Sequence, residues 1–228
     1  MKFPFKKVNF LALFFLSLSL SSESMTEHSI NHQLINRTYL KYVPKKIDYE
    51  NKVDLFIGLH GYTGTASGFE KQTTGSFNKA ADKYKFITIY PQGLYFNSIK
   101  NDPNSFISSW NDLTGSRTKT PNGEICLDNA DIYPQYPSCK DGGRCAWASC
   151  SDDLGFIKKI IDRAKEDHPI RNIYVLGMSN GGMMAQALAC KYPTIFKGVV
   201  NVAGMQHKDL SCIPDQPVNF IIYGGIND

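Results

Sequence analysis

The sequence predicts an α/β domain with a doubly wound, mainly parallel sheet, and three observations support this fold class. The chain has 228 residues, 42% of them hydrophobic, which is enough to bury one substantial core. Short apolar runs alternate with longer amphipathic segments, a pattern typical of strands joined by crossover helices. The apolar runs also lack polar alternation, which indicates a sheet covered on both faces. We expect a single domain over residues 25–228.

Five apolar runs are the predicted strands, because each is rich in β-branched or aromatic residues. They are Val53 to Leu59, Phe86 to Tyr90, Ile173 to Leu176, Val199 to Ala203 and Val218 to Tyr223. The stretch from Met25 to Ile47 fits neither a strand nor a helix pattern clearly, and its structure stays open.

Two amphipathic segments are the predicted helices. The first runs from Asp152 to Asp167, with acidic residues in its first turn, where the helix dipole favours anions. The second runs from about Gly182 to Lys191, and Pro193 lies just beyond its end.

The first 24 residues are predicted to be a secretory signal peptide. Three lysines precede an apolar run from Phe10 to Leu20, and small serines follow that run. The run is shorter than the roughly 20 residues that span a bilayer, although a membrane anchor is the alternative interpretation. We therefore expect a secreted or periplasmic protein without stable membrane association after cleavage. The formal charge of +4 includes no basic stripe outside this segment, so no nucleic-acid partner is expected.

Export favours disulfides as the state of the six cysteines. Four of them lie in a long segment at about 97–150 that is dense in Pro, Gly and Asp, and two lie apart and could form a third bridge. The four are Cys126, Cys139, Cys145 and Cys150, and the two are Cys190 and Cys212. Six cysteines allow 15 pairings, so the connectivity stays open.

Metal sites are the alternative interpretation of the same segment. The spacing of its four cysteines fits no paired C-x-x-C zinc pattern. Asp128, Asp131 and Asp141 could bind calcium, but they do not form a D-x-D-x-D-G loop. We therefore expect no metal and no organic cofactor.

The strongest local motif is the G-x-S-x-G sequence from Gly177 to Gly181, which follows a predicted strand and precedes a predicted helix. A serine at such a turn is held in strained backbone angles with its hydroxyl exposed, and the flanking glycines remove Cβ atoms that would collide. The motif makes Ser179 the candidate nucleophile. A chance glycine turn is the alternative.

Two backbone amides are the candidate oxyanion donors. The N–H of Asn180 lies at the start of the helix after Ser179. The second candidate is the N–H of Tyr62, in the segment His60 to Gly64 that follows the strand Val53 to Leu59. Together these groups could stabilise the negative oxygen that forms when an ester carbonyl is attacked.

The chain also resembles the extracellular esterases grouped with polyhydroxybutyrate depolymerases and feruloyl esterases, a branch of the α/β-hydrolases. The similarity covers roughly Leu55 to Asp228 and rests on several motifs in the same order. These are Leu59 to Ala66, Tyr90 to Gly93, Ser109-Trp110, Asp152 to Ile157, Gly177 to Met184 and Asn201 to Gly204.

The resemblance implies two further site residues. Asp228 matches the triad acid of the family's His-Gly-x-x-Asp turn, although Gly224 stands where the family has histidine. Trp110 matches the family's Ser-Trp pair and lines the acyl pocket in this interpretation, whereas a core tryptophan is the alternative. For Asp228, the alternative interpretation is a polar residue at the chain end without a catalytic role.

The triad histidine of this fold follows the acid, and the sequence stops at Asp228. We therefore expect a fragment that lacks the last strand and helix and the general base. His207 is the least implausible substitute among the five histidines. The expected function is that of a serine carboxylic ester hydrolase acting on small or polymeric esters. The alternatives are a peptidase or lipase on the same fold, and an inactive fragment or pseudoenzyme with a binding role.

Overall fold

The computed structural model describes residues 25–48, 50–97, 106–112, 119–120, 123–124, 132–133, 144–145, 149, 151–204 and 212–225. The predicted signal peptide, the triad candidate Asp228 and His207 lie outside the described residues. The same holds for the side chains of Cys126, Cys139, Cys145 and Cys150 and for the three candidate calcium ligands Asp128, Asp131 and Asp141.

A seven-stranded sheet forms the centre of the described chain, in the order β1-β2-β4-β3-β11-β12-β13. Its strands are β1 (Thr26–His32), β2 (Ile35–Tyr42), β3 (Val53–Leu59), β4 (Ile87–Pro91), β11 (Ile170–Met178), β12 (Gly198–Val202) and β13 (Phe220–Tyr223). Strands β1 and β2 pair antiparallel, and so do β2 and β4, whereas the other neighbours are parallel. The predicted mainly parallel sheet is therefore confirmed.

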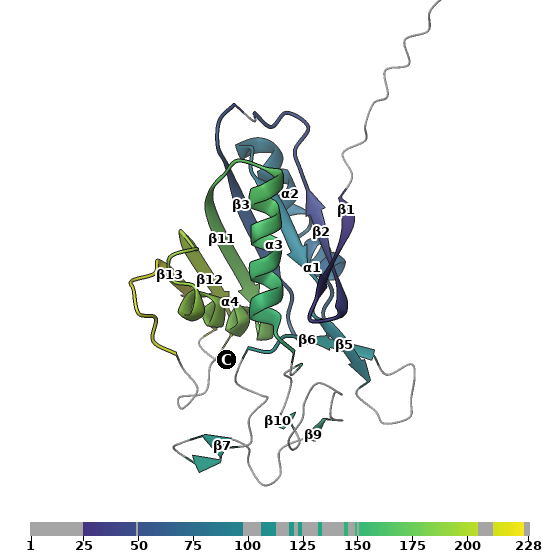
Figure 1. Ribbon diagram of the computed structural model, residues 1–228, viewed down its shortest axis with the longest axis vertical. Helices are drawn as coiled ribbons and strands as arrows, with labels where there is room; N and C mark the ends of the chain where they lie inside the picture. Colours follow the sequence, from purple (N-terminus) through teal and green to yellow (C-terminus); the bar gives the residue numbers. More distant parts are fainter. Residues whose placement is uncertain are drawn as a thin grey trace, which may run out of the picture.

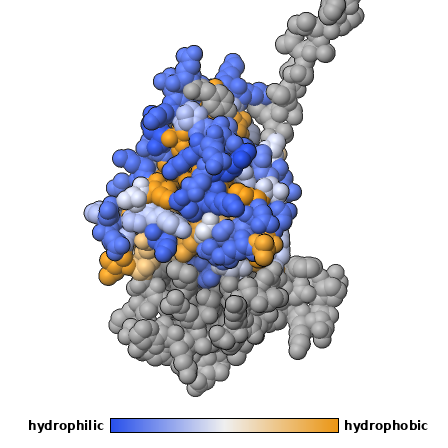
Figure 2. Space-filling model, in the orientation of Figure 1, coloured by the Kyte–Doolittle hydropathy of each residue, from blue (hydrophilic) through white to orange (hydrophobic). Residues whose placement is uncertain are grey.

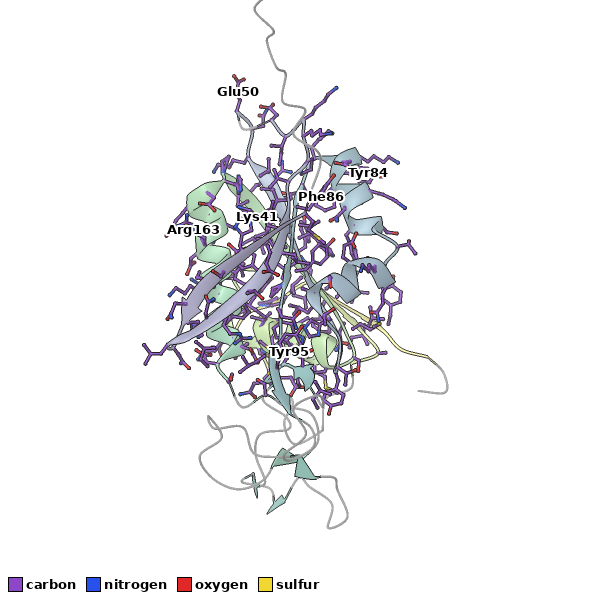
Figure 3. The ribbon with its side chains drawn as sticks, turned by 90° about the vertical axis from the view of Figure 1, so that its right-hand side faces the viewer. Lys41, Glu50, Tyr84, Phe86, Tyr95 and Arg163 are labelled. Carbon is purple, nitrogen blue, oxygen red and sulfur yellow. A yellow bond between two sulfur atoms is a disulfide. The ribbon has the colours of Figure 1, made fainter. Side chains whose placement is uncertain are left out.

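Helices cover both faces of this sheet, as a doubly wound fold requires (Figure 1). Helices α1 (Ala66–Gln72) and α2 (Ser76–Tyr84) pack on β3 and β4. Helix α4 (Asn180–Lys191) packs on β11 and β12, and α3 (Asp153–Asp167) contacts α4 and β1. Figure 3 shows the sheet between α2, which carries Tyr84, and α3, which carries Arg163.

Strand β3 shows why the two faces form. Its alternate residues Leu55, Ile57 and Leu59 are fully buried in the core under α3 and α4. On the opposite face, the Phe56 ring stacks on Phe77 of α2 with centroids 4.5 Å apart. Apart from Asp54 near the start of the strand, both sets of side chains are apolar, and this is why the sequence lacks regular alternation.

The five predicted strands and both predicted helices are present, with boundaries shifted by a few residues. The second helix begins at Asn180, two residues earlier than predicted. The undecided stretch from Met25 to Ile47 contains the β1–β2 hairpin. Its turn residues Gln33 and Leu34 have φ angles of 49° and 65°, a conformation that Asn-Gly sequences usually signal.

The sequence pattern did not reveal α1 and α2, nor the short hairpins of the long segment. The two helices are short and are separated by a turn in which Thr74 and Gly75 have positive φ angles. The short strands are β5 (Leu94–Asn97), β6 (Phe106–Ser109), β7 (Lys119–Thr120), β8 (Gly123–Glu124), β9 (Ile132–Tyr133) and β10 (Arg144–Cys145). Strands β5 and β6 pair as an antiparallel hairpin, and β6 ends at Ser109, directly before Trp110.

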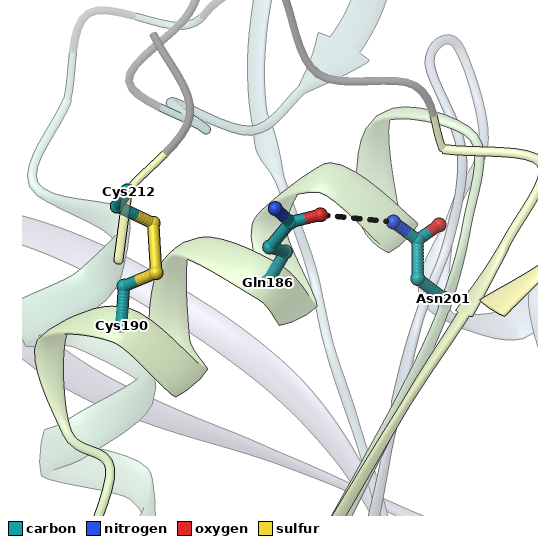
Figure 4. Close-up of a disulfide and its surroundings, with 4 residues drawn as sticks. All are labelled: Gln186, Cys190, Asn201 and Cys212. Carbon is teal, nitrogen blue, oxygen red and sulfur yellow. Dashed lines mark hydrogen bonds between the residues drawn. A yellow bond between two sulfur atoms is a disulfide. The ribbon is translucent and has the colours of Figure 1, made fainter. Parts of the chain in front are cut away.

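The far edge of the sheet combines a disulfide with exposed apolar residues. Cys190, near the end of α4, is bonded to Cys212, which is one of the pairings that the sequence left open (Figure 4). Side chains of β13 and the segment before it are exposed, and Figure 2 shows hydrophobic surface there, at the lower left. These residues are Ile213, Ile221, Ile222 and Tyr223.

Candidate active site

Ser179 lies at a sharp bend between β11 and α4, as the motif predicts. Its backbone angles are φ 54° and ψ −123°, a strained combination for a residue with a Cβ atom. The Ser179 N–H donates to the Val202 carbonyl of the neighbouring strand at 2.8 Å. The residue itself is exposed. The bend thus presents the hydroxyl at the carboxyl end of the sheet, where active sites of this architecture gather.

Two glycines make this bend sterically possible. A Cβ atom on Gly177 would lie 1.9 Å from the Gly181 carbonyl oxygen. A Cβ atom on Gly181 would lie 2.4 Å from the carbonyl oxygens of Leu59 and His60. Real Cβ atoms do not approach oxygen this closely, so both positions require glycine. The second contact also shows that the start of α4 lies directly against the segment after β3.

A buried asparagine supports the bend from the next strand. Asn201 is fully buried, and its side chain accepts from the Gly204 N–H at 2.9 Å and donates to the Gly204 carbonyl at 2.7 Å. Its amide also lies 3.4 Å from the side chain of Gln186 on α4 (Figure 4). A Cβ atom on Gly204 would approach the Ser179 carbonyl oxygen to 2.8 Å. The turn that Asn201 closes therefore packs against the backbone of Ser179.

The predicted oxyanion segment lies beside Ser179. A Cβ atom on Gly61 would be 3.4 Å from the Ser179 Cβ. The Gly64 N–H donates to the Gly61 carbonyl at 3.0 Å, which closes a turn, and Thr63 has a φ angle of 62°. The Thr63 N–H donates to the Ser108 carbonyl of β6 at 2.8 Å. Tyr62, the candidate donor, is half-buried in this turn.

His60 anchors the same turn as a neutral side chain. Its Nε2 accepts from the Gly93 N–H at 2.9 Å, so the ring proton lies on Nδ1, which donates to the Gly61 carbonyl at 2.8 Å. Burial lowers the pKa of His60 to about 4, an effect only partly opposed by the hydrogen bond to Gly61. Because both ring nitrogens are engaged, His60 shapes the turn and does not act as a base for Ser179.

The side chain of Asn180 connects the bend to the segment that follows β6, a role that the sequence reasoning missed. Its Oδ1 accepts from the Trp110 N–H at 2.9 Å and from the Ser109 hydroxyl at 3.2 Å. Its Nδ2 donates to an Asp112 carboxylate oxygen at 2.9 Å and to the Trp110 carbonyl at 3.3 Å. The side chain is 2% exposed. A polar residue directly after the serine, at the start of a mostly apolar helix, was the available signal.

Trp110 itself is fully buried within the main core. Its indole N–H donates to the His60 carbonyl at 2.8 Å, and its ring packs on the His60 ring with centroids 4.8 Å apart. This placement favours the second interpretation of Trp110, as a core residue that supports the oxyanion turn. Its role in lining an acyl pocket stays a prediction.

A buried ion pair holds the start of α3 under the same region. Asp153 and Arg37 are 0% and 3% exposed, and Arg37 Nη2 lies 2.6 Å from Asp153 Oδ1. The other oxygen of Asp153 accepts from the Asn111 N–H and from the Ser149 hydroxyl, each at 2.7 Å. Asp153 therefore joins α3 to β2 and to two segments of the long excursion.

The remaining described histidines lie away from Ser179. His28 stacks on Tyr39, His32 bonds to Asp152 at 3.0 Å, and His168 ends α3. Within the described ranges, no histidine hydrogen-bonds Ser179, and no group of three or more potential metal ligands converges. In the same ranges, every helix is too short or too polar to cross a membrane.

Comparison with known proteins points to one fold family. A family model described as "alpha/beta hydrolase fold" matches residues 54–218. Feruloyl esterase B of Neurospora crassa is 28% identical over 167 residues, which cover 73% of this chain and 43% of that protein. Poly(3-hydroxyalkanoate) depolymerase C of Paucimonas lemoignei is 25% identical over 175 residues, which cover 76% and 32%. The chain thus spans less than half the length of these curated relatives.

Solved structures share the fold at low identity. A structure described as a thermostable esterase has a TM-score of 0.51 and 19% identity, and the match covers 82% of this chain and 42% of that one. A structure described as native pOPH has a TM-score of 0.56 and 12% identity, covering 91% and 69%.

Proposed function

Because this chain belongs to the alpha/beta hydrolase fold family, we propose that it is the part of a serine carboxylic ester hydrolase that carries the nucleophile, Ser179, and the oxyanion donors. The observation that carries the proposal is the bend at Ser179. An exposed serine at φ 54°, between two glycines that no other residue can replace, is held in a strained position that packing alone does not require.

The reaction follows from this placement. The Ser179 oxygen attacks the ester carbonyl carbon, its proton passes to a base, and the carbonyl oxygen becomes negative. The N–H of Asn180 lies in the first turn of α4, where amides have no partner within the helix, and it stabilises that oxygen together with the Tyr62 N–H. The alcohol then leaves with a proton, and water hydrolyses the acyl-serine to release the acid and restore Ser179.

The proposal also includes a base and a triad acid, and both lie outside the described residues. Asp228 is the proposed acid, by its match to the family's turn. The proposed base is a histidine, because a serine hydroxyl attacks efficiently only when an imidazole takes its proton. None of the four described histidines hydrogen-bonds Ser179, and each lies in another local setting, which supports a base outside the described part of the chain.

Export is part of the same proposal. Residues 1–24 are the proposed signal peptide, and the Cys190–Cys212 disulfide is of the kind that persists in oxidising compartments. The names of the relatives support carboxylic esters as the substrate class, with feruloyl and polyhydroxyalkanoate esters as the two specific candidates.

Labelling with a fluorophosphonate probe tests the proposal without a natural substrate. The probe is expected to label a protein in which the proposed histidine base is present, and Ser179→Ala in that protein is expected to abolish labelling. Ser76→Ala, which changes an exposed serine at the start of α2, is the matched control and is expected to leave labelling unchanged. Equal labelling of the Ser179→Ala variant would show that another residue reacts and would refute Ser179 as the nucleophile. No labelling of the protein with Ser179 intact would favour a binding protein without esterase chemistry.

A further inference from the structure

A cavity lies near the turn Gly61–Gly64, on another side of the sheet from the exposed apolar edge at β13. It has a volume of about 240 Å³ and lies between the β1–β2 hairpin, the start of α1 and the residues after β4. Its lining includes Glu27, Thr38, Thr65, Ser67, Gln92 and Tyr95. Pockets for drug-sized ligands usually exceed about 300 Å³. The cavity therefore fits a single small ring.

The groups that line this cavity are mostly polar. Glu27 lies directly opposite Leu40 across the hairpin, and Thr38 lies two residues before Leu40, so all three share one face of the sheet. Among the described residues, none hydrogen-bonds the Glu27 carboxylate or the Tyr95 hydroxyl. Burial and the nearby Glu27 carboxylate raise the pKa of Tyr95, so its hydroxyl stays protonated and can donate. The cavity thus presents the Glu27 carboxylate and the Tyr95 hydroxyl without a hydrogen-bond partner among the described residues.

Tyr95 also offers an aromatic surface. Its side chain is 43% exposed, and it lies at the lower end of the sheet in Figure 3. A tyrosine that is half open to solvent presents an apolar face and a polar tip to a ligand. This combination suits a molecule that has both C–H faces and hydroxyl groups.

The cavity is adjacent to the proposed nucleophile. Gly61 lies beside Ser179. The hydrogen-bonded turn from Gly61 to Gly64 places the Cα atoms of these two glycines within about 7 Å of each other. Thr65 is one residue further, so it lies within about 11 Å of Gly61. Gln92 joins the two sites, because it lines the cavity, accepts from the Ala66 N–H at 2.9 Å and lies 3.4 Å from the His60 ring. One substrate molecule can therefore occupy both sites.

We propose that this cavity is a carbohydrate subsite, which binds one sugar ring of a saccharide ester while its acyl group lies at Ser179. Sugar hydroxyls donate to the Glu27 carboxylate, which only accepts, and exchange hydrogen bonds with the Thr38 and Ser67 hydroxyls. The C–H face of the ring stacks on Tyr95. The inference rests on the proposed esterase function and selects one of its two candidate substrates.

The same chemistry disfavours a polyhydroxyalkanoate at this position. Such a polyester has ester carbonyls and alkyl groups but no hydroxyl donors along its chain. It would place alkyl groups beside the exposed Glu27 carboxylate without supplying a donor, whereas sugar hydroxyls can donate to it. Of the two candidate substrates, the cavity therefore fits the saccharide ester.

Binding of xylotriose, a saccharide without an ester, tests the subsite independently of catalysis. We expect saturation-transfer NMR and calorimetry to show millimolar binding to the unaltered protein. Tyr95→Ala is expected to weaken binding about tenfold, as truncation of a central aromatic contact does, and Glu27→Gln to weaken it several-fold. Tyr84→Ala is the matched control, because Tyr84 is 67% exposed on α2 and lies at the opposite end of the molecule (Figure 3).

The outcomes separate this inference from the proposed function. Fluorophosphonate labelling of Ser179 without xylotriose binding would overturn the subsite and leave the esterase proposal intact. Xylotriose binding that Tyr95→Ala does not weaken would also overturn it, and so would a 3-hydroxybutyrate trimer that competes with xylotriose at equal concentration. Xylotriose binding that depends on Tyr95, in a protein whose Ser179 does not label, would support the subsite and refute the esterase proposal.

Discussion

Replacing Asn180 with leucine should lower the free energy of unfolding by about 3 to 5 kcal/mol. The side chain makes two bonds at 2.9 Å, one from the buried Trp110 N–H and one to the Asp112 carboxylate, which is 1% exposed. Leucine fills a similar volume but leaves both groups short of a partner. A buried neutral group without its hydrogen bond costs about 1 to 3 kcal/mol, and a charged group costs more. The weaker bonds at 3.2 and 3.3 Å add little.

Urea denaturation at pH 7, followed by circular dichroism, measures this loss. Gln186→Leu is the matched control on the same helix, because the Gln186 amide makes only a 3.4 Å bond to Asn201 (Figure 4). Its loss should stay below about 1 kcal/mol. A loss below about 1 kcal/mol for the Asn180 variant as well would refute the reasoning that this side chain fixes the segment after β6.

Three further perturbations follow from the structure. Gly181→Ala should destabilise the fold by about 3 kcal/mol or more, because its Cβ would meet two carbonyl oxygens at 2.4 Å, whereas Gly224→Ala, with no atom within 4 Å, should be neutral in the same denaturation assay. The folded-state pKa of His60 is about 4, below the ordinary 6.5, so its contribution is fully present above pH 6.5 and is lost as pH falls toward 4. It should account for about 2 kcal/mol of the stability lost between pH 7 and pH 5, and a His60→Gln variant with the same pH dependence as the unaltered protein would contradict this. Because a sequence separation of 22 joins Cys190 to Cys212, replacing both with serine should lower the unfolding free energy by about 3 kcal/mol, measured under oxidising conditions, and an unchanged midpoint would contradict it.

The parts of the fold that the sequence predicted are those in which local pattern and burial agree. Strand β3 is apolar on both faces because both faces are covered, and the amphipathic run of α3 begins at Asp152, whose side chain caps the helix by accepting from the Gly155 N–H. The β1–β2 hairpin was undecided because its turn residues, Gln33 and Leu34, carry no glycine or asparagine signal.

The candidate site was predicted in part for similar reasons. The bend at Ser179 requires glycines within the same short motif, so it can be read locally. The bonds from Asn180 to Trp110 join residues 70 positions apart, and the ion pair between Arg37 and Asp153 joins residues 116 apart. Such long-range polar contacts leave no local pattern, so only the structure identifies them.

A crystal structure of the protein with the proposed histidine base present, after reaction with a small fluorophosphonate, would test the central claim most directly. We predict a phosphorus atom bonded to Ser179 Oγ, with one phosphonyl oxygen about 2.7 to 3.1 Å from the backbone nitrogens of Asn180 and Tyr62. An adduct whose oxygen points away from both amides, or an unmodified Ser179 beside a modified residue elsewhere, would contradict it.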